Sequence, residues 1–156
     1  YIKGSAEAVG LMCLHVFLYN KDTDYNQLKP YAESLGSAFQ KINFLRDMHE
    51  DHNALGRVYF PSIKIDNFEN KEKKIIEEDI LKDFENGLKG IKLLDKDSRK
   101  GVYLAYRYYT SLFKKIKNKD ATQILNGRIR LSNFRKLIIL ITSQIEFTFK
   151  IRWKIL

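Results

Sequence analysis

The chain has 156 residues, of which 44% are hydrophobic and 30% are charged, which is enough apolar material for one domain with a core. This composition excludes disordered, collagen-like and mucin-like proteins, and the single cysteine, Cys13, excludes an internal disulfide. The net charge of +9 is unevenly distributed along the chain, because residues 99–156 hold 14 Lys/Arg and only two acids, a balance of +12. This basic segment favours an anionic partner such as phosphate, nucleic acid or an acidic membrane surface.

The first half of the chain predicts two helices. Residues 1–19 are apolar on most sides and predict one helix, which a polar loop at residues 21–24 follows. Pro30 suits the first turn of a second helix, which we expect to run to about Asp51. We expect a turn at residues 56–61 and a loop at residues 62–70.

The second half predicts three more helices. Apolar residues recur at helical spacing from Lys71 to about Leu94, and we expect Ser98 to cap a helix that runs to about Lys117. After a loop at residues 117–122, the last helix is expected from residue 123 to 156, with an irregularity at Asn126 and Gly127. No long run alternates with period two, and none reaches 18 apolar residues. The sequence therefore predicts one all-α domain over residues 1–156, with no clear membrane span.

A polar stripe follows the second predicted helix. Gly36, Gln40, Asn43, Asp47 and Asp51 are spaced by 4, 3, 4 and 4 residues, so they share one side of the helix. The other sides are almost wholly apolar. A helix of this kind belongs inside a bundle, where the stripe would line an internal cavity.

The two acids of the stripe predict a metal site. Asp47 and Asp51 repel each other at this spacing, and only Arg46 lies near them in sequence. A hard divalent cation removes this repulsion, and Mg²⁺ binds through one or two carboxylates together with the phosphates of a substrate. The alternatives are an exposed acidic patch, or a zinc site at His49 and His52, which fall off the stripe.

The start of the chain predicts that it is the C-terminal part of a longer protein. It opens at Tyr1, without Met and without a capping residue, inside an apolar run. The stripe supplies acids from one side only, whereas metal ions that bind the phosphates of a substrate need oxygen ligands from several directions. We therefore expect this chain alone to be inactive, and the preceding half to carry a second acidic helix that faces Asp47 and Asp51.

Residues 32–61 carry a resemblance to a known family. The stretch AESLGSAFQKINFLRDMHEDHNALGRVYFP resembles the second aspartate-rich region of the phytoene/squalene synthase family, the head-to-head trans-prenyltransferases. Residues 1–10 are similar to a family helix that opens with Tyr and ends in Val-Gly, and residues 105–116 and 128–136 resemble its last helices. The resemblance implies the C-terminal portion of an isoprenoid-synthase-type helical bundle around a central cavity. The family's first aspartate-rich motif is absent from this chain and would lie upstream.

The resemblance also implies roles for individual residues. Two acids match those that hold Mg²⁺ bound to a prenyl diphosphate, namely Asp47 and Asp51. Two tyrosines match catalytic residues near the reacting carbons, namely Tyr1 and Tyr109. Amides and arginines match substrate-binding groups in the cavity and near the diphosphate: Gln40, Asn43, Arg46, Arg57 and Arg128.

The reaction implied by the resemblance is a transferase reaction between two prenyl diphosphates. The first ionises with the help of Mg²⁺, and the double bond of the second attacks the allylic cation to form a cyclopropylcarbinyl diphosphate. Overall likeness to bacterial sequences favours phytoene formed from geranylgeranyl diphosphate. Squalene or dehydrosqualene formed from farnesyl diphosphate is the alternative, and NADPH is needed only for squalene. An apolar, water-poor tunnel is required. Five apolar residues are candidates to line it, and ordinary core positions are the alternative for each: Val9, Leu14, Phe17, Phe39 and Phe44.

The basic C-terminal segment predicts a partner. Its apolar and basic residues predict either peripheral binding to an anionic membrane, on the inner face from the cytoplasm, or a packed helix with a solvated basic face. The alternative class is a basic helical module without catalysis that binds membranes or nucleic acid. A nucleic-acid module would stack bases on four tyrosines, namely Tyr103, Tyr106, Tyr108 and Tyr109. The acidic stripe argues against nucleic acid, which we do not expect as a partner. A non-catalytic member of the family is a further alternative.

Overall fold

The computed structural model describes residues 3–55 and 68–148, and this part of the chain is all-α, as predicted. A short π-helix, η1 (Lys3–Glu7), leads into α1 (Ala8–Phe17). The other helices are α2 (Tyr25–Leu55), α3 (Asn70–Leu93), α4 (Lys96–Lys117), α5 (Ala121–Leu125) and α6 (Asn133–Thr148). The predicted turn at 56–61 and most of the loop that follows it lie outside the described residues.

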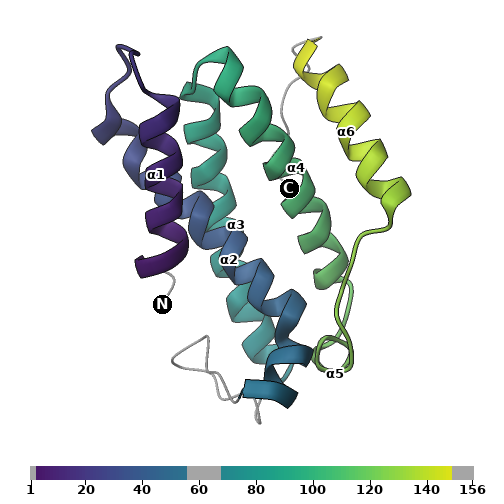
Figure 1. Ribbon diagram of the computed structural model, residues 1–156. Coiled ribbons are helices and arrows are strands. Elements are labelled where there is room, and N and C mark those ends of the chain that lie inside the picture. The colour runs from purple at the N-terminus through teal and green to yellow at the C-terminus, as the bar shows by residue number, and fades with distance from the viewer. Residues whose placement is uncertain (1–2, 56–67, 149–156) are drawn as a thin grey trace.

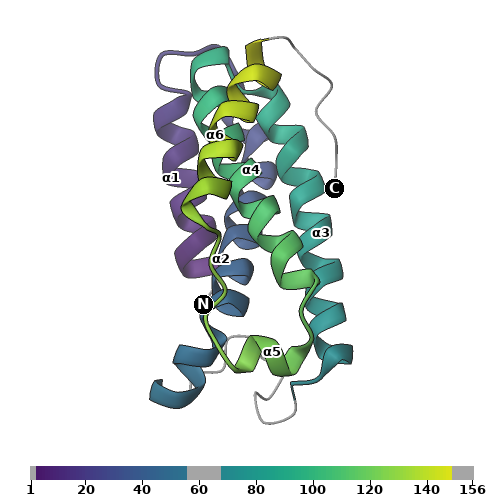
Figure 2. The same ribbon diagram turned by 90° about the vertical axis from the view of Figure 1, so that its right-hand side faces the viewer.

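The long helix α2 is the centre of the arrangement. It packs most extensively against α3 and also contacts η1, α1, α4 and α5. Helix α4 packs against both α3 and α6. Figure 1 shows α1 and α6 on opposite flanks of the molecule. The short α5 lies near the C-terminal end of α2 (Figure 2).

The main core lies between α2, α3 and α4. Its fully buried side chains include Ile42 and Leu45 of α2, Phe84 of α3, and Phe113 of α4. The Phe84 ring meets the Tyr106 ring edge-on, with 5.4 Å between their centroids. Because this core holds one side of α2 fixed, the opposite side of α2 is presented in a fixed orientation.

Helices α3 and α4 begin at capping groups that the sequence only partly revealed. Helix α3 starts with a capping box in which Glu69 and Glu72 exchange side-chain and backbone hydrogen bonds. The prediction that Ser98 caps α4 is wrong. Asp95 is the cap, since its carboxylate accepts from the backbone N–H of Asp97 (3.0 Å) and of Ser98 (3.2 Å). The Ser98 hydroxyl donates to the same carboxylate, and this bond is the main cause that lowers the pKa of Asp95.

The two predicted N-terminal helices differ from the structure at their ends. Helix α1 ends at Phe17 rather than at residue 19, and Asn20 adopts a left-handed conformation with φ of 55°. Helix α2 begins at Tyr25, so Pro30 lies inside it rather than in its first turn. The proline removes a single backbone hydrogen bond there, a loss that the packing of a 31-residue helix tolerates.

The last predicted helix is two helices in the structure. Helix α5 ends at Leu125, residues 126–132 form a connection without helix, and α6 begins at Asn133. The break falls at the Asn126-Gly127 position where the sequence showed an irregularity. It is stabilised because Ile129 and Leu131 are buried against the bundle.

A charged network attaches α6 to α4. Glu146 accepts from the Tyr103 hydroxyl (2.7 Å) and forms an ion pair with Arg107. Burial raises the pKa of Tyr103 to about 12, and the hydrogen bond to Glu146 adds to this effect. Burial opposes ionisation of Glu146, but the bonds from Arg107 and Tyr103 outweigh it and lower the Glu146 pKa.

Candidate functional site

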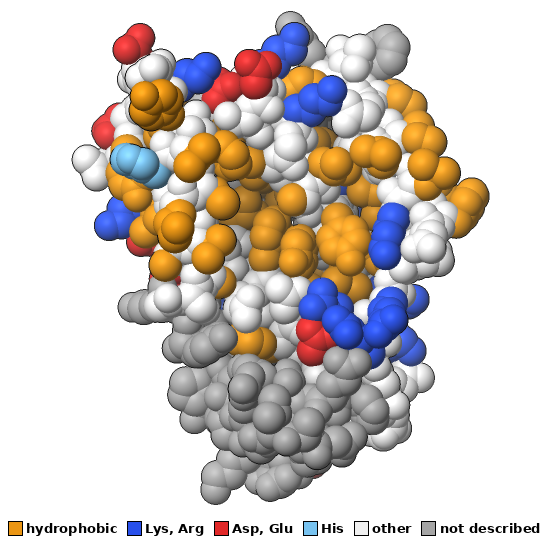
Figure 3. All heavy atoms as spheres, in the orientation of Figure 1, with side chains coloured by type: hydrophobic (Ala, Val, Ile, Leu, Met, Phe, Trp, Pro, Cys, Tyr) orange, Lys and Arg blue, Asp and Glu red, His pale blue; other side chains and the backbone are white. Residues whose placement is uncertain are grey.

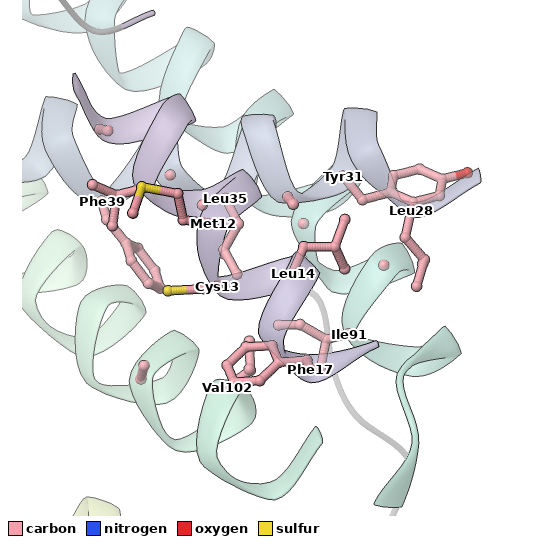
Figure 4. Close-up of a pocket in the computed structure, with 18 of the residues that line it drawn as sticks. Met12, Cys13, Leu14, Phe17, Leu28, Tyr31, Leu35, Phe39, Ile91 and Val102 are labelled. Atoms are coloured by element: carbon pink, nitrogen blue, oxygen red, sulfur yellow. The ribbon is translucent and has the colours of Figure 1, made fainter. Parts of the chain in front are cut away.

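An apolar groove of about 880 Å³ runs between the N-terminal helices and α4. Its walls come from η1, α1, the first half of α2, the end of α3 and the start of α4. Figure 4 shows the labelled apolar side chains of these helices converging on this space. The face of the molecule that is seen in Figure 1 carries hydrophobic side chains in its middle and along both flanks (Figure 3).

The structure tests the residues that we expected to line an apolar tunnel. Four of the five line the groove, namely Val9, Leu14, Phe17 and Phe39. The fifth assignment is wrong, because Phe44 is 5% exposed and is not among the residues that line the groove. Residues 39 and 44 lie on different sides of α2, because they are five positions apart in the helix.

The polar stripe of α2 continues from the groove. Since α2 is unbroken from Tyr25 to Leu55, the stripe runs straight along it. Gly36 and Gln40 line the groove. One turn further on, the Asn43 side-chain oxygen accepts a hydrogen bond from the Tyr109 hydroxyl at 3.3 Å. The Tyr109 ring stacks on Phe39 with 3.9 Å between centroids and 13° between planes, so Tyr109 contacts both a residue that lines the groove and a residue of the stripe.

Asp47, the next residue of the stripe, is held by two arginines. Its Oδ1 atom lies 2.9 Å from Nε of Arg46 and 2.8 Å from Nε of Arg128, and Arg46 also contacts Oδ2. The side chains of Asp47 and Arg46 are 22% and 21% exposed. The hydrogen bond to Asp47 is the main cause that raises the pKa of Arg46. The two guanidinium groups and the Asp47 carboxylate together carry a charge of +1, and Asp51 follows one turn later in α2.

The counter-charge of Asp47 corrects our expectation from the sequence. Only Arg46 lies near Asp47 in sequence, and we expected a metal ion to supply the remaining charge. In the structure Arg128, which the family resemblance assigned to substrate binding, also reaches this carboxylate. The residues between α5 and α6 bring it there. Ile129 donates its backbone N–H to the Arg46 carbonyl at 3.5 Å, and Lys115 donates to the Arg130 carbonyl at 2.6 Å.

The chemistry of these donors is compatible with Mg²⁺. Asp47 offers carboxylate oxygens, and Asp51 follows one turn later in α2. The described residues contain no group of three or more His, Cys, Asp or Glu that could hold a metal alone. Mg²⁺ does not require such a group, because one or two carboxylates and the phosphates of a substrate are its usual ligands. The residues therefore fit a metal ion that binds together with a phosphorylated substrate.

Several predicted site residues lie outside what the structure describes. These are Tyr1, Arg57 and the side chains of His49, Asp51 and His52. The described part brings together the remaining five polar residues along one side of α2, namely Gln40, Asn43, Arg46, Asp47 and Tyr109, with Arg128 added from the connection before α6.

The tyrosines proposed for stacking nucleic-acid bases do not form a surface for them. Tyr103 and Tyr106 are 3% and 2% exposed, and both belong to the main core. Tyr109 is stacked on Phe39. A base needs an accessible ring face, so the structure argues against the stacking surface that a nucleic-acid-binding module would use.

Comparison with known proteins identifies the family of this chain. The squalene/phytoene synthase family matches residues 1–135. A 4,4'-diapophytoene synthase from Staphylococcus haemolyticus is 26% identical over 152 residues, which cover 87% of this chain and 51% of that protein. The chain thus spans about half the length of this curated relative, and no solved structure matches it significantly. The chain belongs to the squalene/phytoene synthase family.

Proposed function

We propose that this chain provides the second acidic motif and part of the prenyl groove of a magnesium-dependent prenyltransferase that condenses two prenyl diphosphates head-to-head. One observation carries the proposal. A single stripe of α2 connects an apolar groove at Gly36 and Gln40 with a cationic cluster at Asp47. The α2 residues that line the groove run from 28 to 40, about 18 Å at the helical rise. This arrangement matches a long apolar chain with a diphosphate at one end.

The charged cluster would bind the diphosphate. Arg46 and Arg128 present planar donors that suit phosphate oxygens, and their spare positive charge favours the anion. Asp47 and Asp51 would hold Mg²⁺, which when bound neutralises the diphosphate and makes it a better leaving group. Arg57 is proposed as a further substrate-binding residue on the basis of the family motif alone.

The groove and its neighbours would handle the reactive carbon chain. When the allylic C–O bond breaks, its electron pair leaves with the diphosphate, and the double bond of the second substrate attacks the cation. Loss of a proton then gives a cyclopropylcarbinyl diphosphate. The apolar walls exclude water that would quench the cation. Tyr109 stacks on the groove residue Phe39, and its hydroxyl donates to Asn43. We propose that Tyr109 and Tyr1 lie near the reacting carbons.

A product assay tests the proposed reaction. The full-length protein that contains this chain is incubated with Mg²⁺ and either geranylgeranyl or farnesyl diphosphate, with and without NADPH. We expect phytoene from geranylgeranyl diphosphate without NADPH. Farnesyl diphosphate converted to dehydrosqualene, or to squalene with NADPH, would support the chemistry and change the substrate. The staphylococcal relative is named for 4,4'-diapophytoene, so the assay has to resolve these products. Binding of a prenyl diphosphate analogue without any turnover would instead indicate a non-catalytic member of the family.

We further propose that the protein binds an anionic membrane peripherally, at the inner face, through α6. Within residues 3–55 and 68–148, no helix combines the length and the apolar character that crossing a bilayer requires. Helix α6 nevertheless exposes large apolar side chains, since Phe134 is 72% and Leu137 is 52% exposed. The neighbouring Arg135 and Lys136 are also exposed and could reach lipid phosphates.

Vesicle binding provides a prediction for this surface. We expect the double variant Arg135→Gln/Lys136→Gln to bind anionic vesicles about thirtyfold more weakly, because each basic residue near such a surface contributes about 1 kcal/mol. The matched control Lys74→Gln/Lys82→Gln removes two exposed lysines from α3, which is not packed against α6, and should bind like the wild type. Equal binding of the wild type to neutral and anionic vesicles in a sedimentation assay would contradict the electrostatic part.

A further inference from the structure

We propose that Arg46 and Arg128 form a latch on Asp47 that couples the binding of the metal ion to the binding of the diphosphate. The latch is defined as the ion pairs of these two arginines with the Asp47 carboxylate. In the structure both arginines are paired with the carboxylate that we propose as a metal ligand, so each partner engages the group that the other ligand would need. The inference rests on the proposed function, because it assigns these groups to Mg²⁺ and to a diphosphate.

The geometry shows why neither ligand alone binds well. Oδ1 of Asp47 accepts from Nε of Arg46 at 2.9 Å and from Nε of Arg128 at 2.8 Å, while Oδ2 contacts Arg46. A cation that approaches this carboxylate meets two guanidinium charges and must displace at least one of them. A diphosphate that approaches the arginines must likewise compete with a carboxylate that already accepts their hydrogen bonds.

Both costs are removed when the two ligands bind together. The diphosphate then takes the arginines, and the released carboxylate takes the metal ion. Each ligand therefore raises the affinity for the other, and the factor must be the same in both directions. The three side chains are 21%, 22% and 34% exposed, so solvent screens their pairing in part, and we expect a coupling of about tenfold.

Arg128 is the member of the latch that can be tested by itself. Arg46 precedes Asp47 in α2, and its substitution would also alter the helix next to the metal ligand. Arg128 comes instead from the connection between α5 and α6, 81 residues along the chain from Asp47. Arg130 lies in the same connection, is exposed, and has no ion pair with Asp47 in the structure, which makes it the matched control.

The test is calorimetric titration of the purified protein with Mg²⁺ alone, with inorganic pyrophosphate alone, and with each in the presence of the other. Free concentrations are corrected for the complex that Mg²⁺ and pyrophosphate form in solution. We expect Arg128→Gln to bind Mg²⁺ alone about fivefold more tightly than the wild type, whereas Arg130→Gln should change this affinity less than twofold. We expect Asp47→Asn to bind metal-free pyrophosphate about tenfold more tightly, since the arginines are released.

A second comparison distinguishes direct pairing of Arg128 with Asp47 from a general effect of removing one positive charge. If Arg128 is engaged by Asp47, then Arg128→Gln should weaken metal-free pyrophosphate binding more in the Asp47→Asn background than in the wild type. Additive effects, or an Arg130→Gln variant that behaves like Arg128→Gln, would overturn the latch. Pyrophosphate that binds to none of the proteins would overturn both the latch and the proposed function. Coupled binding without any product in the assay above would leave the latch standing and reject only the reaction.

Discussion

In the full-length protein that contains this chain, Asp47→Asn should reduce turnover of the prenyl diphosphate roughly a hundredfold, while the protein stays folded. The substitution removes one of the two proposed Mg²⁺ ligands on α2, and this loss of charge stabilisation in the transition state costs about 3 kcal/mol. Its effect on folding should be about 1 kcal/mol or less, because the ion pairs that it breaks are partly exposed to solvent. Steady-state kinetics at saturating Mg²⁺, together with urea denaturation, measures both quantities.

Two comparisons make this expectation specific. Glu78→Gln removes an exposed carboxylate from α3 and should leave both turnover and stability close to the wild type. Asn43→Ala should show a smaller loss than Asp47→Asn, since Asn43 accepts a single hydrogen bond from Tyr109. An Asp47→Asn enzyme with normal turnover would show that this carboxylate is not a metal ligand in the reaction.

The side of α2 that faces the site could be predicted from the sequence. The stripe from Gly36 to Asp47 has helical spacing, and α2 is continuous, so periodicity alone places these residues in a line. The apolar character of the remaining sides correctly placed α2 at the centre of the bundle. The spacing of the stripe and the apolar remaining sides both depend on residues close together in the sequence, so both can be predicted from the sequence of α2 alone.

The position of Arg128 could not be predicted in the same way. Its contact with Asp47 depends on the break between α5 and α6, on the burial of Ile129 and Leu131, and on a backbone bond from Ile129 to Arg46. These are tertiary contacts over about 80 residues, and a helical pattern across residues 123–156 obscured them. The Asn126-Gly127 pair was the only local signal, and it indicated where the helix breaks but not where the chain goes next.

The local sequence pattern also did not reveal which groups balance the charge of Asp47. Asp47 and Asp51 were predicted to repel each other without a metal ion, yet two guanidinium groups balance the first of them in the structure. An ion pair between partly exposed groups is weak enough to be exchanged for a ligand. The same arginines can therefore pair with Asp47 or bind the diphosphate, which is the basis of the latch.

The close approach of η1 to α2 gives the last prediction, which concerns Gly36. A Cβ atom at this position would lie 2.4 Å from the backbone oxygen of Ala6. A backbone oxygen cannot rotate away, so Gly36→Ala must push η1 off α2, and overpacking of this kind costs about 1–3 kcal/mol. Alanine favours a helix over glycine by about 1 kcal/mol, so the expected net loss in the free energy of unfolding is about 2 kcal/mol or less.

The matched control for Gly36 is Gly101, which lies in α4. A Cβ atom there meets nothing within 4 Å, so Gly101→Ala should raise the free energy of unfolding by about 0.5–1 kcal/mol. In urea denaturation, the free energy of unfolding should therefore be lower than that of the wild type for Gly36→Ala and higher for Gly101→Ala. Because η1 and Gly36 both line the groove, Gly36→Ala should also weaken the binding of a prenyl diphosphate more than that of inorganic pyrophosphate, which needs only the charged cluster. If Gly36→Ala were as stable as the wild type and bound both ligands normally, then η1 would not lie against α2 as described, and the groove would lack one of its walls.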